Sequence, residues 1–216
     1  MSRPPYAHRA EAGRELGRLL APDRRADDTV VLGLPRGGVP VAAEVASALH
    51  VPLDVLVVRK LGLPGHEELA MGAVAGVGGE LEVVRNEDVL RSHAVPEAEF
   101  DAVRRRESEQ VRDREQRWRG ERPPLDLAGR TVLLVDDGLA TGATLRAAVA
   151  AVRHRRPGRV VVAAPVGSAQ ACTLLGRTAD AVVCPWRPRP FTAVGQAYAD
   201  FSPTSDAEVG RLLATG

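Results

Sequence analysis

Apolar residues occur in this chain in two patterns, short continuous runs and stretches with helical spacing. The runs predict five buried strands, at residues 29–34, 53–58, 131–135, 159–165 and 181–184. Spacing of three to four positions predicts helices between them, at residues 39–50, 142–155 and 169–177. Strands that alternate with helices favour a doubly wound α/β fold, with a mainly parallel five-stranded sheet and flanking helices.

Three segments fall outside this alternation. Residues 61–79 are rich in glycine and small residues and are expected to form a mobile loop, with a short hairpin at 70–75 and 81–84. Residues 87–119 are dense in charge and predict a solvated helix with i,i+4 ion pairs, a lid or subunit contact being the alternative. The chain ends predict helices at 6–20 and 206–214, with an irregular tail at 185–205.

The length of 216 residues fits a single domain. We expect a core at about 29–184, a helical insertion at about 86–120, and a hood built from 1–28 and 185–216.

Composition narrows the range of partners. The net charge of +1 argues against a general binder of nucleic acid, which needs surplus cations on one face. Cys172 and Cys184 lie in apolar surroundings and are expected to be buried thiols. No apolar stretch approaches membrane-spanning length, and the first 20 residues lack a secretory signal, so a cytoplasmic location without membrane contact is expected. Lys60 is the only lysine, which singles it out as a candidate functional residue.

Residues 132–144 hold the most informative pattern. Four apolar residues end at Asp136 and Asp137, and a turn rich in glycine and threonine then begins a helix. Ligands of open α/β sheets bind at the carboxyl edge of the strands, where such a turn can hold a phosphate. Adjacent acids beside a phosphate are best explained if they hold hydroxyls or hydrated Mg²⁺. Ribose 5-phosphate has this shape; the alternative is an acidic turn before a capped helix.

This segment resembles the signature of type I phosphoribosyltransferases for 5-phosphoribosyl 1-pyrophosphate (PRPP): an apolar stretch, two acids, three residues and Thr-Gly-x-Thr. The resemblance implies that Asp136 and Asp137 are catalytic, bind the ribose hydroxyls, and contact Mg²⁺ only through the ligand or water. It also implies that the 5-phosphate is bound by Gly138, Leu139, Ala140, Thr141, Gly142, Ala143 and Thr144.

Two further segments are assigned to pyrophosphate by the same resemblance. The first is the turn Pro35, Arg36, Gly37 and Gly38, whose N–H groups and guanidinium suit an anion, although an ordinary strand-to-helix turn also explains it. The second is Arg59 and Lys60, also assigned to catalysis, for which a snorkelling surface cation is the alternative. Residues 61–68 would then close over the reaction, with His66 and Glu67 as helpers or bystanders.

The acceptor is expected under the hood. Trp186 lies where purine-type members place an aromatic residue that stacks on the base, and simple packing is the alternative. Ala140 stands where hypoxanthine-type members carry an acid, which weakens the case for a 6-oxopurine. The insertion resembles an uncharacterised bacterial branch of the family more than the base-salvage subfamilies.

The resemblance as a whole predicts a glycosyltransferase of nucleotide and nucleoside metabolism. It would move ribose 5-phosphate from Mg²⁺-bound PRPP to a nitrogenous acceptor, such as a nucleobase, and release pyrophosphate. A homodimer is expected, because dimers are frequent in the family and are the commonest oligomers. A non-catalytic PRPP-sensing regulator and a different phosphosugar binder or hydrolase are the alternatives.

Overall fold

The computed structural model describes residues 5–21, 28–77 and 79–214. Residues 1–4, 22–27 and 215–216 of the predicted hood lie outside the described residues, as does the side chain of Glu67.

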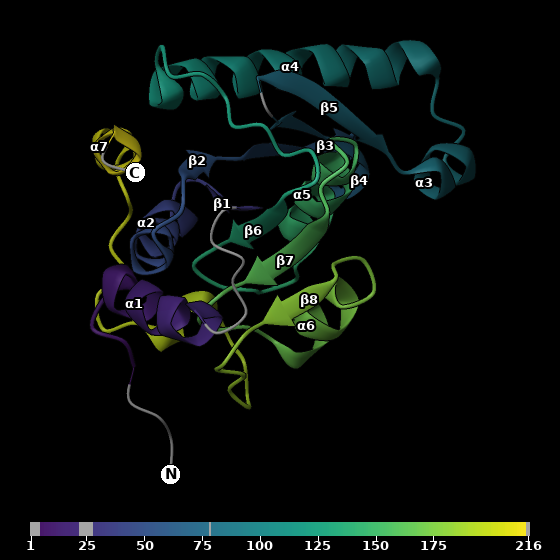
Figure 1. Cartoon of the computed structure of the whole chain (residues 1–216). Helices are drawn as coiled ribbons and strands as arrows, with labels where there is room; N and C mark the ends of the chain where they lie inside the picture. Colours follow the sequence, from purple (N-terminus) through teal and green to yellow (C-terminus); the bar gives the residue numbers. More distant parts are fainter. Residues whose placement is uncertain (1–4, 22–27, 78, 215–216) are drawn as a thin grey trace.

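The centre of the molecule is a five-stranded parallel sheet in the order β2-β1-β6-β7-β8 (Figure 1). Each pairing between neighbouring strands is parallel, as the alternation of strands and helices predicted. The strands are β1 (Thr29–Gly33), β2 (Leu53–Val55), β6 (Thr131–Val135), β7 (Arg159–Ala163) and β8 (Ala181–Val183).

Helices cover both faces of this sheet, which confirms the doubly wound arrangement. In β6, Leu133 and Val135 belong to one core cluster with α2, whereas Val132 and Leu134 belong to another with α5. This division follows from the strand period of two. The helices are α1 (Arg9–Leu20), α2 (Gly38–Leu49), α5 (Ala143–Arg153), α6 (Ala169–Leu175) and α7 (Asp206–Ala214), with a 3₁₀ helix η3 (Val194–Ala197) in the tail.

A second, antiparallel sheet corrects two expectations. It consists of β3 (Val57–Leu63), β4 (His66–Val77) and β5 (Glu80–Arg85). The predicted single strand at 53–58 was wrong, because the chain leaves the parallel sheet after Leu56, whose N–H donates to Gly33 O at 3.0 Å. The expected hairpin between 70–75 and 81–84 is confirmed by the pairing of β4 with β5.

The expected mobile loop at 61–79 was also wrong in its described part, since β3 and β4 occupy most of it. Glycine has a packing role here. A Cβ atom on Gly72 would lie 2.3 Å from Val84 O, and one on Gly76 would lie 2.1 Å from the Glu115 carboxyl carbon. The small residues therefore allow close approach of a strand and a helix.

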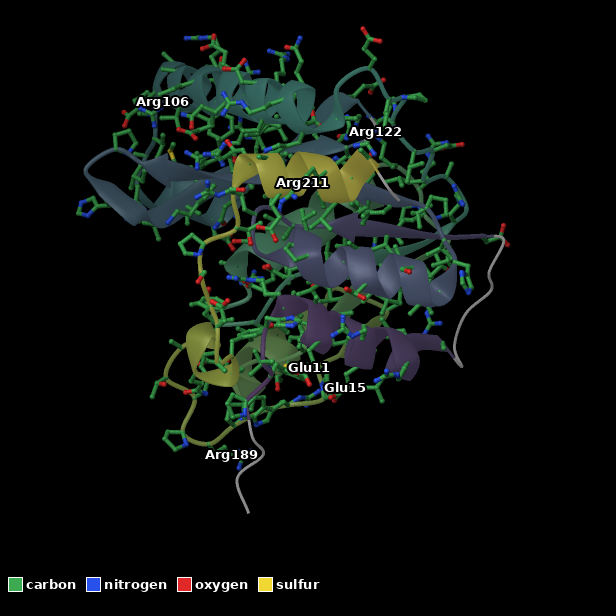
Figure 2. All side chains as sticks on the ribbon, turned by 90° about the vertical axis from the view of Figure 1, so that its left-hand side faces the viewer. Glu11, Glu15, Arg106, Arg122, Arg189 and Arg211 are labelled. Carbon is green, nitrogen blue, oxygen red and sulfur yellow. The ribbon has the colours of Figure 1, made fainter. Side chains whose placement is uncertain are left out.

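The charged segment forms α3 (Glu87–Ser92) and α4 (Glu97–Arg119), and α4 lies across the antiparallel sheet (Figure 1). Its ion pairs include Arg104–Asp101 and Arg119–Glu115. One face is buried, with Phe100, Val111 and Trp118 in the core. Figure 2 shows Arg106 of α4 and Arg189 of the tail at opposite ends of the molecule.

Two expectations from composition can be compared with the structure. Cys172 and Cys184 are free and buried, as predicted. Among the described residues, no helix is both long and apolar enough to cross a membrane.

Candidate functional site

The carboxyl ends of β1 and β6 bring two predicted segments together. Leu34 N donates to Val135 O at 2.9 Å, so the turn after β1 runs beside the end of β6. A Cβ atom on Gly38 would lie 2.7 Å from Val135 O, and one on Gly37 would lie 2.1 Å from Asp137 Oδ2. Glycine is therefore required at both positions for the turn to lie against the acids.

Asp136 and Asp137 are half-buried at the end of β6. The Asp137 N–H donates to Asp136 Oδ1 at 2.8 Å, which fixes the first carboxyl. Burial, followed by the charge of Asp137, raises the pKa of Asp136 well above its usual value, while Arg9 opposes this shift. A carboxyl pair with a perturbed pKa in a strand-end crevice is typical of a functional site.

The turn at 138–144 leads directly into α5. Gly142 precedes the helix with φ of 74°, in the left-handed region that favours glycine. The Ser168 hydroxyl donates to Ala140 O at 2.8 Å, and Leu139 N donates to Val166 O at 2.9 Å. These bonds hold the turn from the β7 side, and Thr141 and Thr144 remain exposed. The start of α5 thus presents a helix N-terminus and two hydroxyls, a suitable arrangement for a phosphate.

Arg59 and Lys60 lie within β3 instead of at a strand end, and they face opposite sides of the antiparallel sheet. The Arg59 guanidinium binds Glu107 of α4 at 2.9 Å. Lys60 is exposed and pairs in register with Ala73, which lines a groove together with Ala143 and Arg146 at the start of α5. Lys60 therefore lies on the side of the candidate phosphate turn, and Arg59 does not.

The remaining predicted residues lie at the rim of the site. Arg36 is exposed and lies 3.6 Å from Asp206, the first residue of α7. His66 is exposed at the start of β4. Neither position brings a side chain between the two acids.

The hood covers the site from the chain ends. The tail places Val194 against Gly138, where an added Cβ would lie 2.4 Å from a Val194 methyl, and the Tyr198 hydroxyl donates to Asp137 O at 2.6 Å. Trp186 is half-buried and meets Tyr6 edge to face, with ring centroids 5.9 Å apart. Trp186 is thus a member of an aromatic cluster at the site's margin.

Two site residues were missed by the sequence analysis. Arg9 Nε donates to Asp137 Oδ2 at 2.8 Å from α1, and Tyr198 reaches the backbone of the same acid. The scarcity of aromatic residues could have drawn attention to Tyr198. No signal marks Arg9, one of many arginines, 128 positions from its partner.

Comparison with known proteins shows the family to which this chain belongs. A family model of the phosphoribosyl transferase domain matches residues 10–192. Two curated Mycobacterium tuberculosis proteins, both named as candidate phosphoribosyl transferases, are 47% identical over 208 residues, which make up 96% of this chain and 46% of theirs. The chain therefore spans about half the length of these relatives.

Solved structures show the same fold. The crystal structure of TT1426 from Thermus thermophilus is 43% identical, covers 98% of both chains and has a TM-score of 0.87. The AQ2163 protein from Aquifex aeolicus shares the fold at 12% identity and a TM-score of 0.52, over 95% of this chain and 84% of that one. With a family match over most of its length, the chain belongs to the phosphoribosyl transferase domain family.

Proposed function

We propose that this chain transfers ribose 5-phosphate from PRPP to a nitrogenous acceptor, a nucleobase or related heterocycle, and releases pyrophosphate. One observation carries the proposal: Asp136 and Asp137 stand between two turns suited to anions, at 35–38 and 138–144. PRPP has the matching order of groups, with hydroxyls between a phosphate and a pyrophosphate.

Each part of the site has a task in this reaction. The turn at 138–144 and the α5 N-terminus hold the 5-phosphate through N–H groups and the hydroxyls of Thr141 and Thr144. Asp136 and Asp137 accept hydrogen bonds from the ribose hydroxyls. Their negative charge also offsets the positive charge that develops on the ribosyl carbon as the bond to pyrophosphate breaks.

The leaving group is assigned to the turn at 35–38. Its two glycines allow the N–H groups to approach pyrophosphate closely, and Arg36 at the rim adds a guanidinium. Lys60 lies on the face of the antiparallel sheet that adjoins α5, the side of the turn at 138–144, and its contact with the leaving group stays a prediction. The contact of Arg59 with Glu107 supports a structural role for Arg59, and its predicted contact with pyrophosphate stays a prediction.

Mg²⁺ is the metal that the family implies. In the described part of the chain, no group of three or more His, Cys, Asp or Glu side chains could hold an ion by itself. Asp136 and Asp137 fit contact through water or through the ligand, which Mg²⁺ accepts because it keeps several waters. When bound with PRPP, the ion would supply further positive charge to the departing pyrophosphate.

The acceptor would enter under the hood, near Trp186. Edge-to-face packing on Tyr6 leaves the role of Trp186 in base stacking a prediction. Ala140 carries no acid that could exchange a proton with the base, so we do not favour a 6-oxopurine. The homodimer, the cytoplasmic location and the place in nucleotide metabolism also stay predictions.

Release of pyrophosphate from PRPP with Mg²⁺ tests this function, with purines, pyrimidines, amines and aromatic heterocycles as acceptors. Release that depends on one acceptor is expected. Tight PRPP binding without release across the panel would favour the PRPP-sensing alternative, and release without any acceptor would favour a hydrolase. Absence of PRPP binding would contradict the whole proposal.

A further inference from the structure

Arg9 is bound on three sides at the edge of the candidate ribose site. Its Nε donates to Asp137 Oδ2 at 2.8 Å, and its NH1 donates to the backbone oxygen of Ser202, also at 2.8 Å. The central carbon of the guanidinium lies over the Phe201 ring, 4.0 Å from the ring centroid. These contacts join the first helix, the C-terminal tail and the end of β6.

The Arg9–Asp137 pair is more enclosed than the ion pair made by another arginine of the same helix. The side chains of Arg9 and Asp137 are 12% and 15% exposed, compared with 46% and 31% for Arg14 and Glu44. Water and salt screen an exposed pair and leave it worth little, whereas an enclosed, hydrogen-bonded pair fixes the geometry of both groups. Arg14 therefore offers a matched control for Arg9.

The tail is attached to Asp137 by a second contact. The Tyr198 hydroxyl donates to Asp137 O at 2.6 Å, and the Tyr198 ring stacks on Phe201 with centroids 5.2 Å apart. Figure 1 shows α1 beside the yellow segments that precede α7. Arg9 thus bridges the two halves of the hood at the acid that faces the ribose.

The Asp137 carboxylate has partners on two sides. Its Oδ2 accepts the hydrogen bond from Arg9, and the Asp136 carboxyl lies within hydrogen-bonding reach of the Asp137 side chain. A carboxylate fixed at one oxygen has a defined direction for its other oxygen, which lowers the entropy cost of binding a hydroxyl.

We propose that Arg9 is a positioning residue that holds the Asp137 carboxylate in place for the ribose hydroxyls and thereby couples the hood to the occupied ribose site. The inference rests on the proposed function, because it takes ribose 5-phosphate as the ligand of Asp137. Arg9 makes no described hydrogen bond to the turn at 138–144 or to the turn at 35–38, although its Nε lies near Gly37, where an added Cβ would be 3.2 Å away. Its loss should therefore affect one part of PRPP recognition more than another.

The experiment compares binding of ribose 5-phosphate and of inorganic pyrophosphate by calorimetry, in the wild type and in Arg9→Gln, Arg9→Lys and Arg14→Gln. Arg9→Gln should lower the affinity for ribose 5-phosphate about tenfold or more, the usual scale for one charge-assisted hydrogen bond, with little change for pyrophosphate. Arg9→Lys keeps the charge but not the planar fork, so it should restore part of the loss. Arg14→Gln should change neither affinity.

The outcomes separate this inference from the proposed function. A wild type that binds neither ribose 5-phosphate nor PRPP overturns the proposed function. A wild type that binds ribose 5-phosphate, with Arg9→Gln binding it equally well, overturns only the inference. If Arg9→Gln or Arg9→Lys lost affinity equally for ribose 5-phosphate and pyrophosphate, Arg9 would have a general structural role. That result would also overturn the inference. If Arg9→Gln fails to fold, the two affinities of Arg9→Lys decide between these results.

Discussion

Two regions of this molecule contain buried or half-buried carboxylates, and they differ in how many of these acids have an arginine partner. Where α4 meets β3 and β2, Arg59 binds Glu107 and Arg119 binds both Asp54 and Glu115. At the carboxyl edge of the parallel sheet, Asp136 and Asp137 are adjacent, and Arg9 reaches only Asp137. In the first region each of the three acids contacts an arginine, with Asp54 and Glu115 sharing Arg119. In the second region, the described residues give Asp137 an arginine partner and give Asp136 none.

The difference separates structure from function. Buried charges that are matched inside the protein are complete without a ligand, and removing one partner leaves a costly unpaired charge. Burial and a neighbouring acid raise the pKa of both Glu115 and Asp136, but Glu115 has Arg119 at 3.0 Å. Asp136 has no such partner among the described residues, so it gains from donors that a ligand supplies. We therefore expect substitutions in the first region to change stability and substitutions in the second to change binding.

The largest effect is expected at the α4 interface. Arg119→Met leaves Asp54 and Glu115 without their cation, and the side chains of Arg119 and Asp54 are only 8% and 7% exposed. The free energy of unfolding should fall by about 3–5 kcal/mol, as for other broken buried pairs. Urea unfolding measures the loss. The folded variant should still bind ribose 5-phosphate like the wild type, and a large loss of affinity would break the comparison.

Asp137→Asn should have the next largest effect, on binding. The amide cannot act as the anionic acceptor for a ribose hydroxyl, and one of its two positions becomes a donor. The affinity for PRPP should fall by about 2–3 kcal/mol, the scale of a hydrogen bond to a charged group, with the fold retained. Calorimetric titration provides the measurement, with Asp101→Asn in the half-buried Arg104 pair, far along the chain from the site, as control. Unchanged PRPP affinity would remove Asp137 from the site.

Gly38→Ala tests the close approach of the turn at 35–38 to the acids. The new methyl would lie 2.7 Å from Val135 O and 2.9 Å from Asp136 Cα, both backbone atoms of the β6 end. Such overpacking costs about 1–3 kcal/mol of stability, and the displaced turn should bind pyrophosphate more weakly.

The control for this substitution is Gly210→Ala in α7, where an added Cβ has nothing within 4 Å. It should stabilise the helix by about 0.5–1 kcal/mol. Thermal unfolding with and without pyrophosphate measures both variants. If Gly38→Ala and Gly210→Ala had the same thermal stability and the same response to pyrophosphate, the proposed packing of the turn would be contradicted.

The smallest effects should separate the neighbours Arg59 and Lys60. Lys60→Ala should weaken pyrophosphate binding about tenfold, by the loss of one cation, and ribose 5-phosphate binding much less. Arg59→Ala, which leaves Glu107 without this cation, should lower stability and spare both ligands. Titrations with each ligand measure the affinities of the two variants, and urea unfolding measures their stabilities. Equal loss of both ligands in Lys60→Ala would count against its proposed role.

The central fold and the acid pair could be predicted from the sequence because their signals are local. The apolar run at 131–135 matches β6, and the spacing at 206–214 matches α7. The antiparallel sheet was not predicted as such, because the glycines at 72 and 76 have the composition of a loop and reveal their packing role only beside Val84 and Glu115. Similarly, the strand was expected to end at residue 58, so Arg59 and Lys60 were not predicted to lie on opposite faces of a sheet. Because β3 continues through both residues, Arg59 points toward α4 and Lys60 points away from it.

The hood was only partly predictable, since its contacts join distant segments. The bond from Arg9 to Ser202 spans 193 positions, and the bond from Tyr198 to Asp137 spans 61. Neither side chain belongs to a motif, so only the folded chain shows that both meet at the acid pair.

A crystal structure of the chain with ribose 5-phosphate and Mg²⁺ tests the central claim most directly. The account predicts the phosphate on the turn at 138–144, at the start of α5, and the ribose hydroxyls on Asp136 and Asp137. A phosphate bound elsewhere, or hydroxyls directed away from both carboxylates, would contradict it.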